Sequence, residues 1–173
     1  MTLEIAEFHS PIGTIVLAVR DGTLTALVFA EGWPDRRARL VKRFGEVDLR
    51  RVADPARVSG RLAAYFAGDL SALDAIAVDP SGTPFQRRVW AALRTIPPGE
   101  TVSYQTLARR IGAPTAVRAV GAANRTNPIG IVVPCHRVIG ADGRLTGYAG
   151  GLARKRWLLA HERADAAEQR SLL

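Results

Sequence analysis

The chain of 173 residues is long enough for one substantial core or two small ones, and its 47% apolar and 23% charged residues favour a soluble globular protein. No apolar run reaches the length of a membrane span, and the start of the chain is unlike a signal peptide. One unpaired cysteine makes a reducing cytoplasm the expected location. The single cysteine excludes an internal disulfide and a cysteine zinc cluster.

The net charge of +8 is concentrated in the second half of the chain. Residues 1–80 carry 10 basic and 11 acidic side chains, whereas residues 81–173 carry 14 and 5. This asymmetry suggests a polyanion partner. A solvated basic surface of an arginine-rich protein would give the same count, so the charge alone does not decide.

The first half predicts a small antiparallel sheet with helices. Residues 12–29 form a pattern typical of a β-hairpin around Asp21-Gly22, and residues 3–9 are a candidate third strand. Pro34 begins a basic amphipathic helix that ends at Gly45, and a second helix is expected over 55–67. The linker 79–82 then divides the chain into domains 1–80 and 81–173.

The second half predicts a mostly helical domain. Thr83 is a candidate N-cap with Pro84 behind it, and apolar residues at helical spacing continue to Ile96. Ser103 and Thr115 are candidate caps for two further helices. The remaining expected elements are a buried strand over 131–133, a hairpin over 137–148 around Asp142-Gly143, a helix over 152–162 and a loose polar tail.

The stretch from Ser103 to Asn124 has the helix, glycine-containing turn and helix of a DNA-binding helix-turn-helix. Its second helix combines small residues with two arginines, and the candidate DNA contacts are Ala116, Arg118, Ala119, Ala122, Ala123 and Arg125. Small side chains would let a DNA backbone approach closely. The alternative is that this small-residue face packs against another helix. This alternative stays open because many sequences with a helix-turn-helix pattern do not bind DNA.

Cys135, in the run Pro134-Cys135-His136, is either a buried structural thiol or a nucleophile. A neighbouring imidazole could accept the thiol proton directly or through a water molecule, and an acid could orient that imidazole. Among the five carboxylates of the second half, Glu162 is the best placed to be partly buried, because it lies at the end of an apolar helix. An exposed charge at the helix end is the alternative, although it would oppose the helix dipole.

Several motifs across residues 83–162 resemble the O6-alkylguanine-DNA alkyltransferases, also called methylated-DNA–protein-cysteine methyltransferases. The motifs are Thr-Pro-Phe-Gln at 83–86, Val-Ser-Tyr-Gln at 102–105, Arg-Ala-Val-Gly at 118–121, Asn127-Pro128, Ile-Val-Val-Pro-Cys-His-Arg-Val at 131–138, Gly-Tyr-Ala-Gly-Gly-Leu at 147–152 and Trp-Leu-Leu-Ala-His-Glu at 157–162. Glu162 is the last residue of the motif at 157–162. Residues 1–80 resemble the family's variable N-terminal domain more loosely.

The resemblance implies a role for each matching residue. Cys135 would be the alkyl acceptor, His136 the water-mediated base and Glu162 the acid that orients it. Asn127 would bridge the helix-turn-helix to the active-site segment and contact the guanine, and Tyr104 would help to flip the nucleotide and protonate the leaving guanine. Further implied roles are a finger that fills the gap in the base stack for Arg118, and pocket walls for Tyr148, Val138 and Ala149.

The same resemblance implies a ribonuclease H-like N-terminal domain and a C-terminal domain with a minor-groove helix-turn-helix. The expected partner is double-stranded DNA containing alkylated guanine, and O4-alkylthymine is a further candidate lesion. The expected protein is a monomer without cofactor, metal or membrane association, and cooperativity on DNA is left open. A thioether does not hydrolyse readily, so each molecule would act once. Departures from the family pattern are Arg125-Thr126, which bears on DNA affinity, and Ala149, which replaces a serine found in some members.

Three rival functions remain at this stage. A relative that recognises lesions without repairing them would lack the cysteine, which this chain keeps. A helix-turn-helix regulator would carry Cys135 incidentally. A thiol hydrolase would need an oxyanion-hole motif, which the sequence does not offer.

Overall fold

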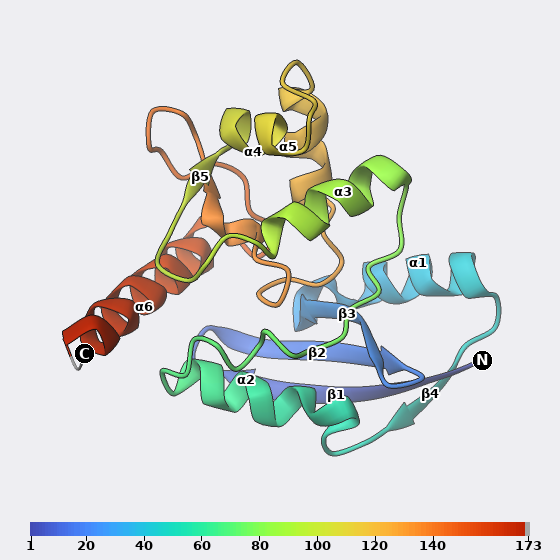
Figure 1. Ribbon diagram of the computed structural model, residues 1–173. Coiled ribbons are helices and arrows are strands. Elements are labelled where there is room, and N and C mark those ends of the chain that lie inside the picture. Colours follow the sequence, from blue (N-terminus) through green and yellow to red (C-terminus); the bar gives the residue numbers. More distant parts are fainter. Residues whose placement is uncertain (172–173) are drawn as a thin grey trace. The chain divides into compact units, whose positions relative to one another are not determined.

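The computed structural model describes the backbone of residues 1–171 and the side chains of residues 1–163, and it shows a mixed α/β protein (Figure 1). Two compact units make up the chain. The first comprises Met1–Pro80 together with Pro128–Val132, and the second comprises Ser81–Asn127 together with Val133–Leu173. Segment 128–132, which the sequence analysis places in the second domain, packs with the first unit. No helix in the described part of the chain has the length and apolar character needed to span a membrane.

The first unit is built on a four-stranded sheet with the order β3-β2-β1-β4. Its strands are β1 (Thr2–Ser10), β2 (Gly13–Arg20), β3 (Thr23–Phe29) and β4 (Asp48–Arg51). The predicted third strand and hairpin are confirmed, and both pairs among β1, β2 and β3 are antiparallel. The predicted antiparallel sheet is therefore confirmed for three strands, whereas β4, a fourth strand that was not predicted, pairs parallel to β1. A crossover through a helix lies between β3 and β4, and such a connection allows parallel pairing.

The Asp21-Gly22 turn of the hairpin has the backbone conformation expected for a two-residue hairpin turn. Asp21 and Gly22 both have positive φ, at 48° and 77°. A two-residue turn with this backbone matches the right-handed twist of the flanking strands, which is why Asp-Gly is favoured there.

Helices α1 (Trp33–Phe44) and α2 (Val58–Phe66) belong to the first unit. Leu3 of β1 shares a core cluster with Leu40 of α1, whereas Phe8 of β1 stacks on Phe66 of α2. Residues of odd and even number point to opposite faces of a strand, so the two helices cover opposite faces of the sheet. The helix expected over 55–67 begins only at Val58, because the preceding residues form a 3₁₀ turn with positive φ at two non-glycine positions.

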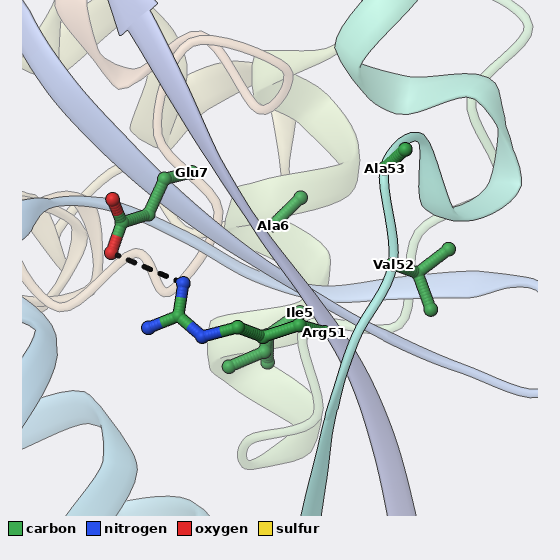
Figure 2. Close-up of a pocket in the computed structure, with 6 residues that line it drawn as sticks. All are labelled: Ile5, Ala6, Glu7, Arg51, Val52 and Ala53. Carbon is green, nitrogen blue, oxygen red and sulfur yellow. Dashed lines mark ion pairs between the residues drawn. The ribbon is translucent and has the colours of Figure 1, made fainter.

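Charged side chains line the free edge of the sheet at β4. Figure 2 shows residues that line a pocket there, among which Glu7 and Arg51 form an ion pair with 3.7 Å between Oε1 and Nη1. A second ion pair joins Glu4 to Arg50. Such charges discourage the pairing of an exposed edge strand with another chain.

The second unit contains four helices and two short strands among its described residues. These are α3 (Pro84–Leu93), β5 (Val102–Ser103), α4 (Tyr104–Arg110), α5 (Val117–Arg125), β6 (Val138–Ile139) and α6 (Leu152–Ser171). The predicted caps at Thr83 and Ser103 are confirmed, and Thr83 forms a full capping box with Gln86. The predicted cap at Thr115 is wrong, because α5 follows Ala116 without a side-chain cap.

Two further predictions for this half are wrong. Residues 131–133 form tight turns instead of a strand: Ile131 has a φ of +66°, and Val132 and Cys135 each donate to the carbonyl two residues earlier. Residues 137–148 do not form a hairpin, because β6 pairs parallel with β5. The predicted turn still forms within it, since Gly143 donates to Gly140.

The final helix is longer than expected. The backbone of α6 stays helical to Ser171, so the first nine residues of the predicted loose tail continue the helix, and residues 172–173 lie outside the described part. Glu162 therefore lies inside the helix, not at its C-terminal end. The expected conflict with the helix dipole does not arise there, since that effect is confined to the terminal turns.

Candidate active site

Cys135 lies in a deeply buried segment of the second unit. It opens a single 3₁₀ turn, Cys135–Arg137, directly after Pro134. Its side chain is buried, as is every residue from 131 to 138. The adjacent His136 and Arg137 complete the same turn.

His136 and Arg137 both bind the carboxylate of Glu162. The Nε2 atom of His136 lies 2.7 Å from Oε1 of Glu162. Arg137 donates from Nε to Oε2 at 3.0 Å and from Nη2 to Oε1 at 2.8 Å, and its Nη1 donates to the carbonyl oxygen of Ile96 at 2.6 Å. His136 and Glu162 are fully buried. Helix α6 thus holds one carboxylate against two adjacent residues of the cysteine segment.

The carboxylate fixes the tautomer of His136. Burial opposes the ionisation of Glu162, but His136 and Arg137 outweigh it and hold the pKa of Glu162 well below its ordinary value. An ionised carboxylate only accepts hydrogen bonds, so Nε2 of His136 carries the proton. In the neutral imidazole the lone pair is then on Nδ1, which is buried and has no hydrogen-bond partner among the described residues. His136 therefore presents a base whose proton-accepting atom is unoccupied by any described protein group.

Two groups near the thiol of Cys135 favour its ionisation. Burial raises the pKa of the thiol, while a hydrogen bond with Asn127 and the positive charge of Lys155 act in the opposite direction. Lys155 is itself fully buried and donates from Nζ to the carbonyl oxygens of Val138 at 2.6 Å and Thr146 at 2.8 Å. Burial lowers the pKa of Lys155 to about 8, although the charge of Cys135 raises it.

Tyr148 also lies close enough to Cys135 for their charges to interact. Burial raises the pKa of Tyr148 well above its ordinary value, and the negative charge of an ionised Cys135 raises it further. The phenol is therefore neutral and able to donate a hydrogen bond at physiological pH.

Two asparagines tie the end of α5 to the cysteine segment. Asn127 donates from Nδ2 to the carbonyl oxygen of Val133 at 2.8 Å, and Asn124 donates from Nδ2 to the carbonyl oxygen of Cys135 at 3.3 Å. Both side chains are buried. The position of α5 and the position of the thiol are thereby coupled.

A second group of predicted residues lines a surface pocket. The residues that line it are Tyr104, Val117, Arg118, Gly121, Arg125, Thr146 and Gly147. Tyr104 donates from its hydroxyl to the carbonyl oxygen of Thr146 at 3.3 Å. The pocket therefore joins α4 and α5 to the loop that also carries Tyr148 and the exposed Ala149.

Helix α5 presents part of the predicted contact face to solvent. Arg118, Ala119, Ala122 and Arg125 are exposed, and Ala116 precedes the helix. The prediction for Ala123 is wrong, because its side chain is only 2% exposed and its carbonyl oxygen accepts a hydrogen bond from Trp90 at 2.8 Å. Ala123 falls on the same helical side as Val120, three residues earlier, and this side faces the core.

Three residues of this site have no role in the sequence analysis. Arg137 enters there only as a letter of a motif, Asn124 only as a helix end, and Lys155 only as one residue of a helix. A signal exists for Asn124 and Lys155, since each falls on the buried side of a helix where a polar residue is uncommon. No cluster of three metal-ligating side chains occurs within the described residues.

The fold and this site define a protein with a buried thiol, an adjacent histidine held by a carboxylate, and a helix, α5, whose exposed side carries small residues and two arginines. Comparisons with known proteins identify relatives of this chain. Residues 84–164 match the family model of the 6-O-methylguanine DNA methyltransferase DNA-binding domain. A methylated-DNA–protein-cysteine methyltransferase of Mycolicibacterium paratuberculosis is 50% identical over 169 residues, covering 93% of each chain.

Two further comparisons extend this result. The methylated-DNA–protein-cysteine methyltransferase of Salmonella typhimurium is 60% identical over 109 residues, which are 63% of this chain and 64% of that protein. That match therefore spans less than two thirds of the Salmonella protein. Mycobacterium tuberculosis OGT, crystallised in complex with DNA, has a TM-score of 0.78 and is 43% identical, over 95% of this chain and 94% of that one. The chain belongs to the methylated-DNA–protein-cysteine methyltransferase family.

Proposed function

We propose that the protein repairs DNA by transferring the alkyl group of O6-alkylguanine to its own Cys135. The observation that carries this proposal is the unoccupied Nδ1 of His136, whose Nε2 is held by Glu162 beside the only cysteine. This arrangement suits a group that takes the thiol proton through one water molecule. The family membership and the DNA-bound relative support the choice of DNA as substrate.

The chemical step exchanges one bond for another. The sulfur of Cys135 forms a bond to the alkyl carbon while the bond from that carbon to O6 breaks, and the bonding electrons remain on guanine. The thiol loses one proton towards His136 and guanine gains one, for which Tyr104 is the proposed donor. Burial raises the pKa of Cys135, so a base is needed to produce the thiolate, and Lys155 and Asn127 favour its formation.

The alkyl carbon of a paired guanine lies inside the duplex, so the base must leave the stack to reach a buried thiol. Helices α4 and α5 are proposed to bind DNA as a helix-turn-helix whose exposed small-residue face enters the minor groove. Arg118 would fill the gap in the stack, and Arg125 would contribute positive charge nearby. Since both arginines line the same pocket as Tyr104, we place the extruded nucleotide in this pocket.

The chain contains one cysteine, so no second thiol can take the alkyl group from the thioether on Cys135. We therefore propose that each molecule acts once. Residues 1–80 are proposed to form a supporting N-terminal domain, and residues 81–173 to form the domain that binds DNA and reacts.

The test is a stoichiometric one. The protein is mixed with a duplex that contains one O6-methylguanine, and the intact mass and a peptide map are measured. One methyl group on Cys135 per molecule is expected, with none from an unmodified duplex and none for Cys135→Ala. Repeated turnover, or methylation at another residue, would overturn the proposal. Lesion binding without transfer would indicate a recognition protein, and sequence-specific binding indifferent to alkylation would indicate a regulator.

A further inference from the structure

Asn124 has an unused hydrogen-bond acceptor beside the reacting residue. Its side chain lies on the buried side of α5 and is 2% exposed. Its Nδ2 donates to the carbonyl oxygen of Cys135 at 3.3 Å, and its Oδ1 is buried without a hydrogen-bond partner among the described residues. None of the roles assigned above uses this oxygen.

The orientation of the amide follows from chemistry. A backbone carbonyl only accepts hydrogen bonds, so the amide nitrogen must face Cys135, and a flipped amide would bring two acceptors together. Both amide atoms are bonded to the same carbon, so Oδ1 lies next to the backbone of Cys135. A buried acceptor without a partner is destabilising and rare in folded proteins. Its presence beside the backbone of Cys135 points to a donor that arrives with the substrate.

The substrate offers only one kind of N–H donor on its base. Alkylation at O6 removes the proton from N1 of guanine, so the two N–H bonds of the 2-amino group are the only ones left on the ring system. O4-alkylthymine has no N–H donor at all, because its N3 is also unprotonated. A single acceptor near the alkylated base can therefore distinguish these two lesions.

We infer that Oδ1 of Asn124 accepts a hydrogen bond from the 2-amino group of O6-alkylguanine, which makes Asn124 a specificity-determining residue. This inference rests on the proposed function. It implies that the protein prefers alkylated guanine to O4-alkylthymine. The loss of one buried hydrogen bond is expected to lower the rate about 3- to 10-fold.

The test removes each partner of the bond in turn. Single-turnover transfer rates are measured with duplexes containing O6-methylguanine or O6-methylhypoxanthine, which lacks only the 2-amino group. The wild-type protein should react with the guanine duplex about 3- to 10-fold faster. In Asn124→Leu, which has a similar shape but neither donor nor acceptor, the two rates should become equal, and the loss should fall on the guanine duplex.

A matched control is Trp90→Phe, which removes a buried hydrogen bond to the carbonyl of the adjacent Ala123. It should leave the ratio of the two rates at the wild-type value, even if both rates fall. Equal wild-type rates with the two duplexes would overturn the inference without any variant, as would an unchanged ratio in Asn124→Leu. These outcomes would mean that Oδ1 binds a buried water molecule or serves the fold alone. Absence of transfer from either duplex would instead overturn the proposed function.

Discussion

Replacing Glu162 by glutamine is the most informative single change, because this carboxylate serves both the fold and the reactive residues. In the wild-type protein it accepts hydrogen bonds from Nε2 of His136 at 2.7 Å and from Nε and Nη2 of Arg137 at 3.0 and 2.8 Å. Arg137 is 7% exposed, so water cannot solvate its guanidinium group when the negative charge of Glu162 is removed. Glutamine keeps one acceptor oxygen, but its amide N–H₂ group would face a donor group of His136 or Arg137.

The magnitude follows from the burial of the ion pair. Removing one partner of a buried pair costs about 3–5 kcal/mol, because the other charge remains desolvated. The amide oxygen of the introduced glutamine retains part of the interaction, so a loss of about 3 kcal/mol is expected for Glu162→Gln. The free energy of unfolding is measured by urea denaturation at neutral pH. Glu100→Gln, an exposed site with the same change of charge, is the matched control and should change the stability by less than about 0.5 kcal/mol.

The pH dependence gives an independent check. The pKa of Glu162 is held below its ordinary value of 4.5 in the folded protein. Its contribution to stability is therefore complete above that pH and is lost as the pH falls towards the folded-state value. The stability difference between the wild-type protein and Glu162→Gln should shrink as the pH is lowered below 4.5. A difference that is constant with pH would show that ionisation of Glu162 does not stabilise the fold.

The transfer rate separates the chemical role from the structural one. In Glu162→Gln the neutral amide no longer stabilises the imidazolium that forms when His136 takes the thiol proton. The single-turnover rate, corrected for the folded fraction, should fall about 100-fold, as is usual when acid–base catalysis is impaired. A corrected rate equal to that of the wild-type protein would refute the orienting role, whatever happens to the stability.

Three other predictions concern parts of the site and the fold that act separately. Arg118→Ala should weaken binding to alkylated duplex and reduce the salt dependence of that binding, as measured by fluorescence anisotropy at several salt concentrations; unchanged affinity would exclude a DNA contact. Lys155→Met should make the change in the free energy of unfolding between pH 8 and 10.5 less positive than in the wild-type protein, because the pKa of Lys155 is lowered from 10.5 to about 8 in the folded protein, so that unfolding takes up a proton in that interval. Thr83→Ala should lower the melting temperature through a loss of about 1 kcal/mol, since it removes the capping box of α3, and Thr83→Ser should restore it.

Elements with local signals could be predicted from the sequence, because their causes lie within a few residues. The turn at Asp21-Gly22 needs two residues with positive φ, and the cap at Thr83 needs a hydroxyl and a glutamine three positions apart. Residues 131–133 show the limit of this reasoning. Three consecutive apolar residues resemble a buried strand, but the fold buries them in turns whose backbone groups bond locally. Periodicity cannot distinguish the two, since both bury every side chain.

The reacting residues of the site could be predicted from the sequence, and so could Glu162, but the supporting residues Asn124 and Lys155 could not. Cys135 and His136 are adjacent in sequence, so their chemistry is visible without a fold. Asn124 and Lys155 depend on which side of a helix is buried, and a polar residue on a buried side weakens the apolar pattern that identifies that side. Supporting residues such as Asn124 and Lys155 are therefore difficult to identify from the sequence pattern alone.

Helix α6 shows why these supporting residues matter. Lys155 and Glu162 are seven residues apart, which is close to two helical turns, and both are buried on the side that also carries Leu158 and Leu159. Lys155 holds the backbone of Val138 and Thr146, while Glu162 holds His136 and Arg137. One rigid helix thus fixes the cysteine segment at two points, with opposite charges. Because a helix keeps this spacing constant, the base and the cation near Cys135 stay aligned with each other.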